Sequence, residues 1–324
     1  MADMIRRFLM AAATALTLLP VLAHADPPPT MVRIGALVPP VLTSPEEGMR
    51  QGLKELGYIE GRNLTIERRL GETNDALQSG AAELVRSRVD VIVAFGTAAA
   101  HAALSATSTI PVVFISGDPV GTGLAGSLAR PGSNGTGVSS LSSELMSKRL
   151  ELLQKVAPRI RRVILLGNPS SPLHTGVLRE TQNAARTLHL RIVTLDARNA
   201  DGLDAALRGI QRDAADAFIV SSDVLFLGNR EKIATAVAKA KLPAIFPWPD
   251  YHDAGVLMSY GANLREAGRQ MAGYVDRILK GAKPGELPIE QMSKYELVID
   301  LRVARATGLK VPQELLLSAD AVIR

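Results

Sequence analysis

Short apolar segments alternate with helical segments along most of the chain, and this alternation restricts the fold more than any other feature. Most of these segments lack a polar residue at every second position, which is typical of parallel strands covered by helices on both faces. A Gly/Ser/Asn-rich stretch at 131–135 interrupts the alternation. The pattern predicts an α/β protein with two doubly wound parallel-sheet lobes of four or five strands each. The predicted strands are 32–38, 64–69, 91–95, 112–116, 162–166, 190–195, 217–220 and 244–246.

The helix that follows the first strand carries its own start and stop signals. Ser44 is the predicted N-cap, Pro45 the first helical residue and Glu47 the second member of a capping box. Gly57 is the predicted end of this helix.

Length and composition exclude several classes of protein. A chain of 324 residues predicts two domains, and the absence of cysteine excludes disulfide scaffolds, thiolate metal sites and a cysteine nucleophile. The net charge of +5 comes from 37 basic and 32 acidic residues without a long run of one sign. A scattered excess of this size is typical of a solvated surface, so no nucleic-acid partner is expected.

Residues 1–25 have the three parts of a secretory signal peptide. The basic pair Arg6-Arg7 precedes an apolar segment at 8–22, and Ala23-His24-Ala25 forms a small-x-small cleavage site. The apolar segment is shorter than about 18 residues and contains Pro20, which argues against a membrane anchor. We therefore expect cleavage after Ala25 and an exported mature protein in an oxidising compartment.

Ligands of doubly wound sheets bind beyond the carboxyl ends of the strands, and one such loop suits an anion. Gly96, Thr97 and Ala98 join the strand 91–95 to a helix. The free N–H groups at a helix N-terminus attract a carboxylate, and Thr97 would add a hydroxyl donor. The alternative is that Thr97 only caps its helix.

Two acidic residues at strand ends are candidates for binding an ammonium group. Asp118 follows the strand 112–116 and Asp223 follows the strand 217–220. Either carboxylate could pair with the amine of an amino-acid ligand. Alternatively, Asp118 could form a turn with Pro119, and Asp223 could cap the helix near Gly228.

Three further residues of these loops are candidates for ligand contact. Asn168 follows the strand 162–166, and His174, a little further on, could either contact the ligand or cap a helix. Trp248, the only tryptophan, stands between Pro247 and Pro249 after the strand 244–246. A rigid indole at a cleft edge offers an apolar wall and a cation–π face, unless it packs beneath the loop instead.

No motif for catalysis or for a cofactor competes strongly with binding. Residues 121–126 match the dinucleotide pattern G-x-G-x-x-G, but they do not close the first strand, and no acidic residue follows at the required place. The sequence contains neither a P-loop nor the G-x-S-x-G or H-E-x-x-H motifs. The expectation is a binding protein and not an enzyme, without a cofactor or a metal.

A set of longer motifs resembles a known family. The motifs are ELGYIEGRN at 55–63, FGTAA at 95–99, GDPVG at 117–121, LARPGSN at 128–134, Asn168-Pro169 and GVLMSYG at 255–261. In these motifs, and from about residue 32 to the C-terminus, the chain is similar to the ABC-transporter substrate-binding proteins of tryptophan or tyrosine transport systems.

The resemblance implies a type I periplasmic binding fold, in which two lobes joined by three crossovers close on a ligand like a Venus flytrap. By analogy the crossovers lie near 139–143, 259–261 and 287–291. Lobe one would then be 31–140 plus 261–288, and lobe two 141–260 plus 289–324. Gly137 and Gly261 are expected either to ease the hinge rotation or to be plain turn glycines.

The resemblance also implies a function. The protein would capture a small solute, an aromatic amino acid or else a small organic anion, and deliver it as a monomer to a membrane permease and its ATPase. The alternative is a periplasmic sensor that feeds a chemoreceptor or another signalling partner. Transcription regulators share this two-lobed fold, but they carry an N-terminal helix-turn-helix where this chain has the predicted signal peptide.

Overall fold

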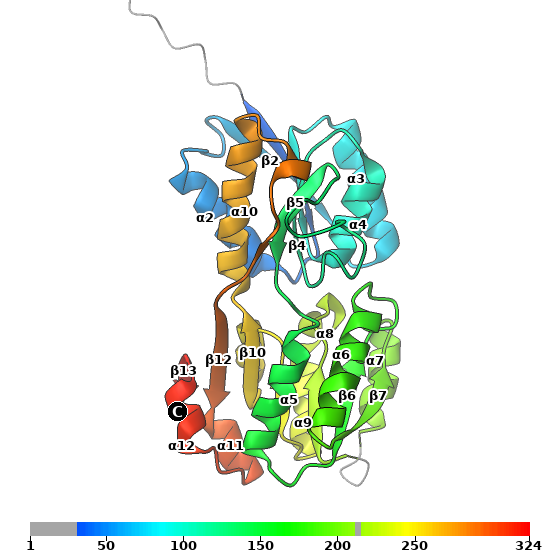
Figure 1. The fold of residues 1–324 in the computed structure, drawn as a ribbon, viewed down its shortest axis with the longest axis vertical. Helices are drawn as coiled ribbons and strands as arrows, with labels where there is room; N and C mark the ends of the chain where they lie inside the picture. Colours follow the sequence, from blue (N-terminus) through cyan, green and yellow to red (C-terminus); the bar gives the residue numbers. More distant parts are fainter. Residues whose placement is uncertain (1–30, 211–214) are drawn as a thin grey trace, which may run out of the picture. The chain divides into compact units, whose positions relative to one another are not determined.

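The computed structural model describes residues 31–210 and 215–324, which form two sheets flanked by helices (Figure 1). In these ranges the first sheet has six strands in the order β11-β5-β4-β3-β1-β2, and every neighbouring pair is parallel. The two-lobed α/β fold predicted from the sequence is confirmed. The strands are β1 (Val32–Val38), β2 (Leu64–Leu70), β3 (Val91–Phe95), β4 (Val112–Ser116), β5 (Gly135–Ser139) and β11 (Glu290–Gln291).

Helices cover both faces of the first sheet, which explains its continuous apolar strands. Val91, Val93 and Phe95 of β3 belong to the same core as α2 and α10, whereas Ile92 and Ala94 belong to the core of α3 and α4. Successive side chains of a strand point to opposite faces, so both sets must be apolar. The helices are α2 (Thr43–Glu55), α3 (Asn74–Arg86), α4 (Thr97–Ala106) and α10 (Leu264–Leu279).

The helices α2 and α10 lie side by side although they are far apart in the sequence (Figure 1). A Cβ atom on Gly48 of α2 would lie 1.9 Å from the carbonyl oxygen of Arg265, and one on Gly268 of α10 would lie 1.9 Å from that of Pro45. The two backbones therefore approach so closely that only glycine fits at these positions.

The second sheet is built in the same way, with one exception. In the described ranges it has seven strands in the order β13-β12-β10-β9-β8-β6-β7, and only the pair β10–β12 is antiparallel. This pair corrects the expectation of purely parallel sheets: β10 leads the chain out of the second sheet and β12 brings it back. The strands are β6 (Arg162–Gly167), β7 (Arg191–Asp196), β8 (Ala217–Val220), β9 (Ala244–Phe246), β10 (Met258–Ala262), β12 (Tyr295–Asp300) and β13 (Ala321–Ile323).

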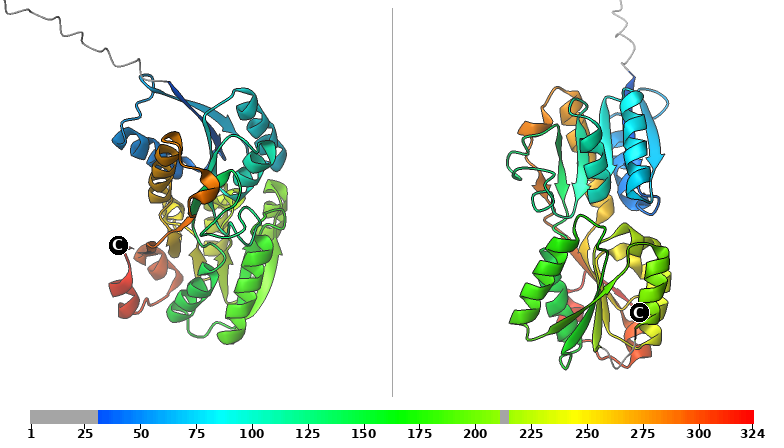
Figure 2. Two further views of the ribbon diagram at one scale, coloured as in Figure 1. Left: turned by 45° about the horizontal axis from the view of Figure 1, so that its top comes forward. Right: turned by 90° about the vertical axis from the view of Figure 1, so that its right-hand side faces the viewer.

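Two groups of helices cover the two faces of the second sheet (Figure 2). The helices α5 (Leu145–Val156) and α6 (His174–Thr187) share one core with Val163 and Ile219. On the other face, α7 and α9 share a core with Ile164 and Val220. The remaining elements are α7 (Ala200–Arg208), α8 (Val224–Gly228), α9 (Arg230–Lys239), α11 (Leu301–Thr307), α12 (Gln313–Ser318), η1 (Pro249–Ala254) and η2 (Pro284–Glu286).

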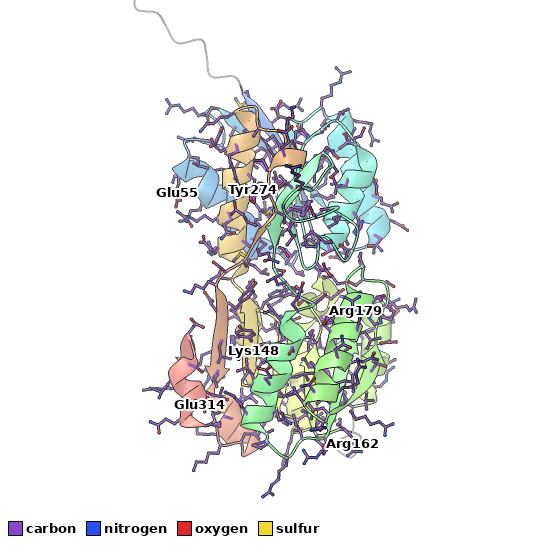
Figure 3. All side chains as sticks on the ribbon, viewed as in Figure 1. Glu55, Lys148, Arg162, Arg179, Tyr274 and Glu314 are labelled. Atoms are coloured by element: carbon purple, nitrogen blue, oxygen red, sulfur yellow. The ribbon has the colours of Figure 1, made fainter. Side chains whose placement is uncertain are left out.

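The chain passes between the two sheets after β5, after β10 and after β11. Gly261 and Ala262 pair with β12 in the second sheet, whereas β11 pairs with β5 in the first. We propose these three crossings as the hinge, the second and third of them a few residues later than the resemblance suggests. The hydroxyl of Tyr274 donates to the Pro288 carbonyl (2.6 Å) and accepts from the Glu290 N–H (3.1 Å), so α10 holds the segment that leads into the third crossing (Figure 3).

Neither of the two predicted hinge glycines is a turn glycine. Gly137 lies in β5 and Gly261 in β10. A Cβ atom on Gly137 would lie 1.9 Å from the Phe114 carbonyl oxygen, and one on Gly261 would lie 1.8 Å from that of Pro247. Close approach of neighbouring backbones requires both glycines, and a role in hinge rotation stays a prediction.

The predicted capping box of the first helix is wrong. Helix α2 begins at Thr43, and its N-cap is Leu42, a core residue whose hydrocarbon side chain has no atom that could accept a capping bond. Glu47 instead pairs with Arg265 of α10. The tertiary packing of α2 against α10 thus overrides the local capping pattern.

The sequence predicted an exported protein without a membrane anchor. The predicted signal peptide at 1–25 lies outside the described residues. Within 31–210 and 215–324, no helix is both long enough and apolar enough to cross a bilayer.

A half-buried histidine beside β10 predicts an acid-sensitive fold. His252 of η1 lies 2.8 Å (Nε2) from the Ser259 hydroxyl, and burial lowers its pKa from 6.5 to about 4 although Asp300 and Asp253 favour the charged form. Between these values only the unfolded chain takes up the proton, so the free energy of unfolding should fall as the pH falls, by about 3 kcal/mol in total.

Denaturant titrations at a series of pH values would measure this loss. The variant His252→Gln should show a shallower decline over the same interval. His189→Gln, at an exposed histidine, should keep the wild-type slope. A wild-type slope in the His252 variant would contradict the assignment.

Candidate functional site

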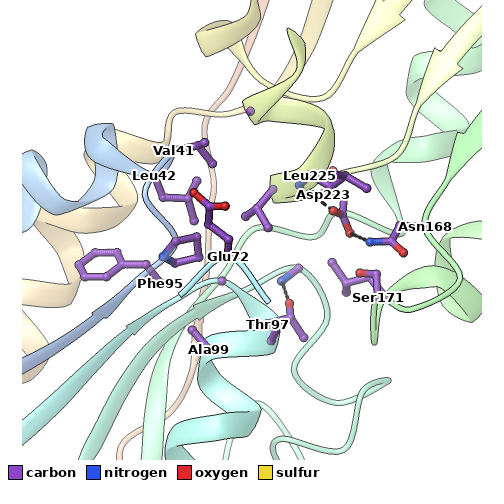
Figure 4. A pocket seen from close by; sticks show the side chains of 18 of the residues that line it. Val41, Leu42, Glu72, Phe95, Thr97, Ala99, Asn168, Ser171, Asp223 and Leu225 are labelled. Carbon is purple, nitrogen blue, oxygen red and sulfur yellow. Dashed lines mark hydrogen bonds between the residues drawn. The ribbon is translucent and has the colours of Figure 1, made fainter. Parts of the chain in front are cut away.

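A cleft of about 600 Å³ lies at the carboxyl ends of the strands and is lined by residues from both lobes (Figure 4). Its volume falls within the range of small-molecule sites. Six of the eight predicted site residues line it: Gly96, Thr97, Ala98, Asn168, Asp223 and Trp248. Asp118 and His174 do not belong to the lining.

The N-terminus of α4 opens onto the cleft. Gly96 is its N-cap, with a φ of 98° that favours glycine, and the first intrahelical bond runs from the Ala100 N–H to the Gly96 carbonyl (3.0 Å). The N–H groups of Thr97, Ala98 and Ala99 therefore come before the first intrahelical bond, as at every helix start. This end of the cleft suits a carboxylate.

Thr97 does not cap its helix, because the N-cap is Gly96. Its hydroxyl lies 3.0 Å from that of Ser116 and accepts the Gly117 N–H at 3.2 Å. All three groups are buried, so Thr97 links the start of α4 to the end of β4.

Replacing Thr97 with valine should therefore lower stability. The Gly117 N–H would lose its acceptor in a buried place, which costs about 1–3 kcal/mol of unfolding free energy. Chemical denaturation would measure the loss, and Thr97→Ser should recover most of it. Unchanged stability combined with weaker ligand binding would assign the hydroxyl to the ligand instead.

Asp223 brings a buried carboxylate to the opposite side of the cleft. It caps α8 as the sequence allowed, with Oδ1 accepting the Leu225 N–H at 2.9 Å, and Oδ2 accepts from the Asn168 amide at 3.2 Å (Figure 4). Burial raises the pKa of Asp223, although these bonds, Ser171 and His174 favour its charged form. Within the described ranges, no lysine or arginine forms an ion pair with this carboxylate, so a ligand cation would be its natural partner.

The structure gives Asp118 the alternative role that the sequence allowed for it. Its Oδ1 accepts the Gly121 N–H at 2.7 Å and so forms a turn outside the cleft lining. His174 is the first residue of α6, and its ring lies against Gly167, where a Cβ atom would be 3.1 Å from Cε1. Asp118 is not brought together with the six residues that line the cleft, whereas His174 lies outside the lining but near enough to Asp223 to favour the charged form of that carboxyl.

Trp248 is both a core residue and a wall of the cleft. Its side chain is only 7% exposed and stacks on Tyr251 at a centroid distance of 6.3 Å. It nevertheless lines the cleft, together with apolar residues of the first lobe such as Leu42, Phe95 and Leu264. The lining of the cleft therefore combines an apolar part with the N-terminus of α4 and the carboxylate of Asp223.

Several lining residues were not among the predicted ones. Ser140 and Ser142 follow β5, which the Gly-rich sequence did not predict as a strand. Glu72 and Arg198 follow β2 and β7, and the ends of those predicted strands could have identified them. The lining serine Ser222 has a buried hydroxyl without a hydrogen-bond partner among the described residues.

Known proteins resemble this chain in sequence and in fold. A tyrosine-binding protein of Clostridioides difficile is 24% identical over 273 residues, which are 84% of this chain and 78% of the relative. A crystal structure of a conserved domain protein from Vibrio cholerae O1 biovar El Tor has a TM-score of 0.85 at 28% identity, covering 91% of this chain and 99% of that one. An ABC domain in complex with L-Trp, from Streptococcus pneumoniae, has a TM-score of 0.85 at 24% identity, covering 91% and 100% of the two chains.

The match extends to a whole-family model. The model described as "ABC transporter substrate binding protein" matches residues 34–323, nearly all of the described chain. Type I periplasmic binding proteins such as a leucine-binding protein of Thermotoga maritima also share the fold, with a TM-score of 0.60 at 13% identity over 77% of this chain and 83% of that one. The chain therefore belongs to the family of ABC transporter substrate-binding proteins.

Proposed function

We propose that this protein is the extracytoplasmic solute-binding component of an ABC import system and that its ligand is an aromatic amino acid. The tyrosine-binding relative and the L-Trp complex support this ligand class. The observation that carries the proposal is the presence of a helix N-terminus and a buried, unpaired carboxylate in one cleft. An α-amino acid carries the two complementary charges.

Each part of the ligand has a proposed place. The ligand carboxylate accepts hydrogen bonds from the N–H groups of Thr97 and Ala98, and the ammonium group pairs with Asp223, which Asn168 holds in position. The aromatic side chain lies along Trp248. Since the cleft is lined by both lobes, a ligand that bridges them stabilises the closed arrangement.

The family and the predicted signal peptide support the setting that we propose. The chain is exported by residues 1–25, cleaved after Ala25 and works in the periplasm as a monomer without catalysis. Its partners are a membrane permease and the ATPase of the importer.

Calorimetry with a matched set of ligands tests the ligand class. L-tryptophan and L-tyrosine should bind, whereas tryptamine lacks the carboxylate, indole-3-propionate lacks the ammonium, and both should bind at least about tenfold more weakly. At about 100 times its dissociation constant, a true ligand should also add about 2.7 kcal/mol of stability. If indole-3-propionate bound as tightly as L-tryptophan, the ligand would be an organic anion and not an amino acid.

A further inference from the structure

Arg149 of α5 is completely buried and has no carboxylate partner within the described ranges. Burial lowers its pKa to about 10, so the guanidinium stays protonated at neutral pH. A buried charge is tolerated only where hydrogen-bond acceptors surround it.

The acceptors belong to two segments of the second lobe. Arg149 Nε donates to the Tyr260 carbonyl at 2.8 Å, and Nη2 donates to the Pro247 carbonyl at 3.2 Å. Nη1 lies 3.3 Å from the sulfur of Met146, one turn earlier in the same helix. Tyr260 stands in β10 just before the chain crosses to α10, and Pro247 immediately precedes Trp248.

Gly261 leaves the space in which Arg149 makes these contacts. A Cβ atom on Gly261 would lie 1.8 Å from the Pro247 carbonyl oxygen and 3.3 Å from Arg149 Nη2. Only glycine therefore lets β10 and the loop before Trp248 approach the guanidinium together. Trp248 also stacks on Tyr251, so this ring contacts the indole while Arg149 binds the backbone of the residue before it.

We propose that Arg149 is a positioning residue that fixes the Trp248 wall of the cleft to β10, the strand that leads into the hinge. The helix α5 itself begins directly after the first crossing between the sheets, so one guanidinium joins two hinge segments to the ligand wall. The role in ligand binding rests on the proposed function. The placement of Trp248 does not, because it can be measured without a ligand.

The emission of Trp248 tests the proposal directly, since the chain has one tryptophan. Arg149→Met should shift the emission to longer wavelength and increase quenching by acrylamide in a protein that is folded by circular dichroism. Arg149→Lys should fall between this variant and the wild type. The matched control is Lys148→Met, which removes the same charge from the exposed neighbour on α5 (Figure 3) and should leave the emission unchanged.

Native emission and native quenching in folded Arg149→Met would overturn the proposal. If that variant does not fold, Arg149→Lys and Arg149→Gln are measured in the same way. Loss of the fold in all three would assign Arg149 to general core stability and would equally overturn the proposal.

A double-mutant cycle tests the link to the ligand. Arg149→Met should weaken L-tyrosine binding about tenfold when Trp248 is present, but less than about twofold in the Trp248→Ala background. Equal losses in both backgrounds would show that Arg149 does not act through Trp248. If the wild type binds no amino acid, the proposed function fails, while the emission measurements still decide the placement of Trp248.

Discussion

Replacing Gly268 with alanine should lower the free energy of unfolding by about 3 kcal/mol. The added Cβ atom would lie 1.9 Å from the Pro45 carbonyl oxygen and 2.7 Å from its carbon, both backbone atoms of α2. Since neither helix can yield by turning a side chain, the whole α2–α10 contact must open. Denaturant-induced unfolding, followed by circular dichroism, would measure the effect.

The same substitution at Gly273 provides the control on the same helix. A Cβ atom there meets nothing within 4 Å, so only the helix propensity changes. Alanine should then raise the free energy of unfolding by about 0.5–1 kcal/mol. If the two alanine variants were equally stable, close helix packing could not be the reason for Gly268.

Replacing Asp223 with asparagine should weaken the binding of an amino-acid ligand about 100-fold, or by about 2.7 kcal/mol. The substitution removes the buried charge that the proposed function pairs with the ligand ammonium. Asparagine retains an oxygen that can accept the Leu225 N–H, so the cap of α8 should survive. Because burial raises the pKa of Asp223, loss of the charge should not reduce stability at neutral pH.

Calorimetry with L-tryptophan and indole-3-propionate would measure both sides of this prediction. The deaminated ligand should lose less than about threefold in affinity, since it has no ammonium group to pair. Asp118→Asn, at a carboxylate that only holds the turn to Gly121, should bind L-tryptophan as the wild type does. Wild-type affinity in Asp223→Asn would show that Asp223 does not pair with the ligand.

The alternation of apolar strands and helices was sufficient to predict most of the sheets. Strands such as β3 and β4 are apolar on both faces and match their predicted bounds, 91–95 and 112–116. The sequence did not predict β5, because Gly135 and Gly137 are typical of a loop. Only the structure shows that the backbone of β4 lies so close to β5 that Gly137 is required there. It did not predict β10 or β12 either, because their pairing depends on a chain that leaves the second sheet and returns.

The candidate site was predictable to the extent that strand ends define it. Gly96, Asn168, Asp223 and Trp248 come directly after buried strands and line the cleft. Asp118 also comes just after a strand, yet its carboxylate turns to the Gly121 N–H, a choice that depends on local backbone geometry. The sequence did not identify Arg149 as a buried residue, because in a helical sequence it resembles the exposed basic residues around it.

The late position of α10 in the sequence also determines when each lobe can be completed during synthesis. Strands β1–β5 are made first, but the apolar face that α10 covers stays open until residues 264–279 follow. The partner of β10 in the second lobe, β12, is made later still. A growing chain therefore carries two unfinished cores at once, and both become closed only as its last part emerges.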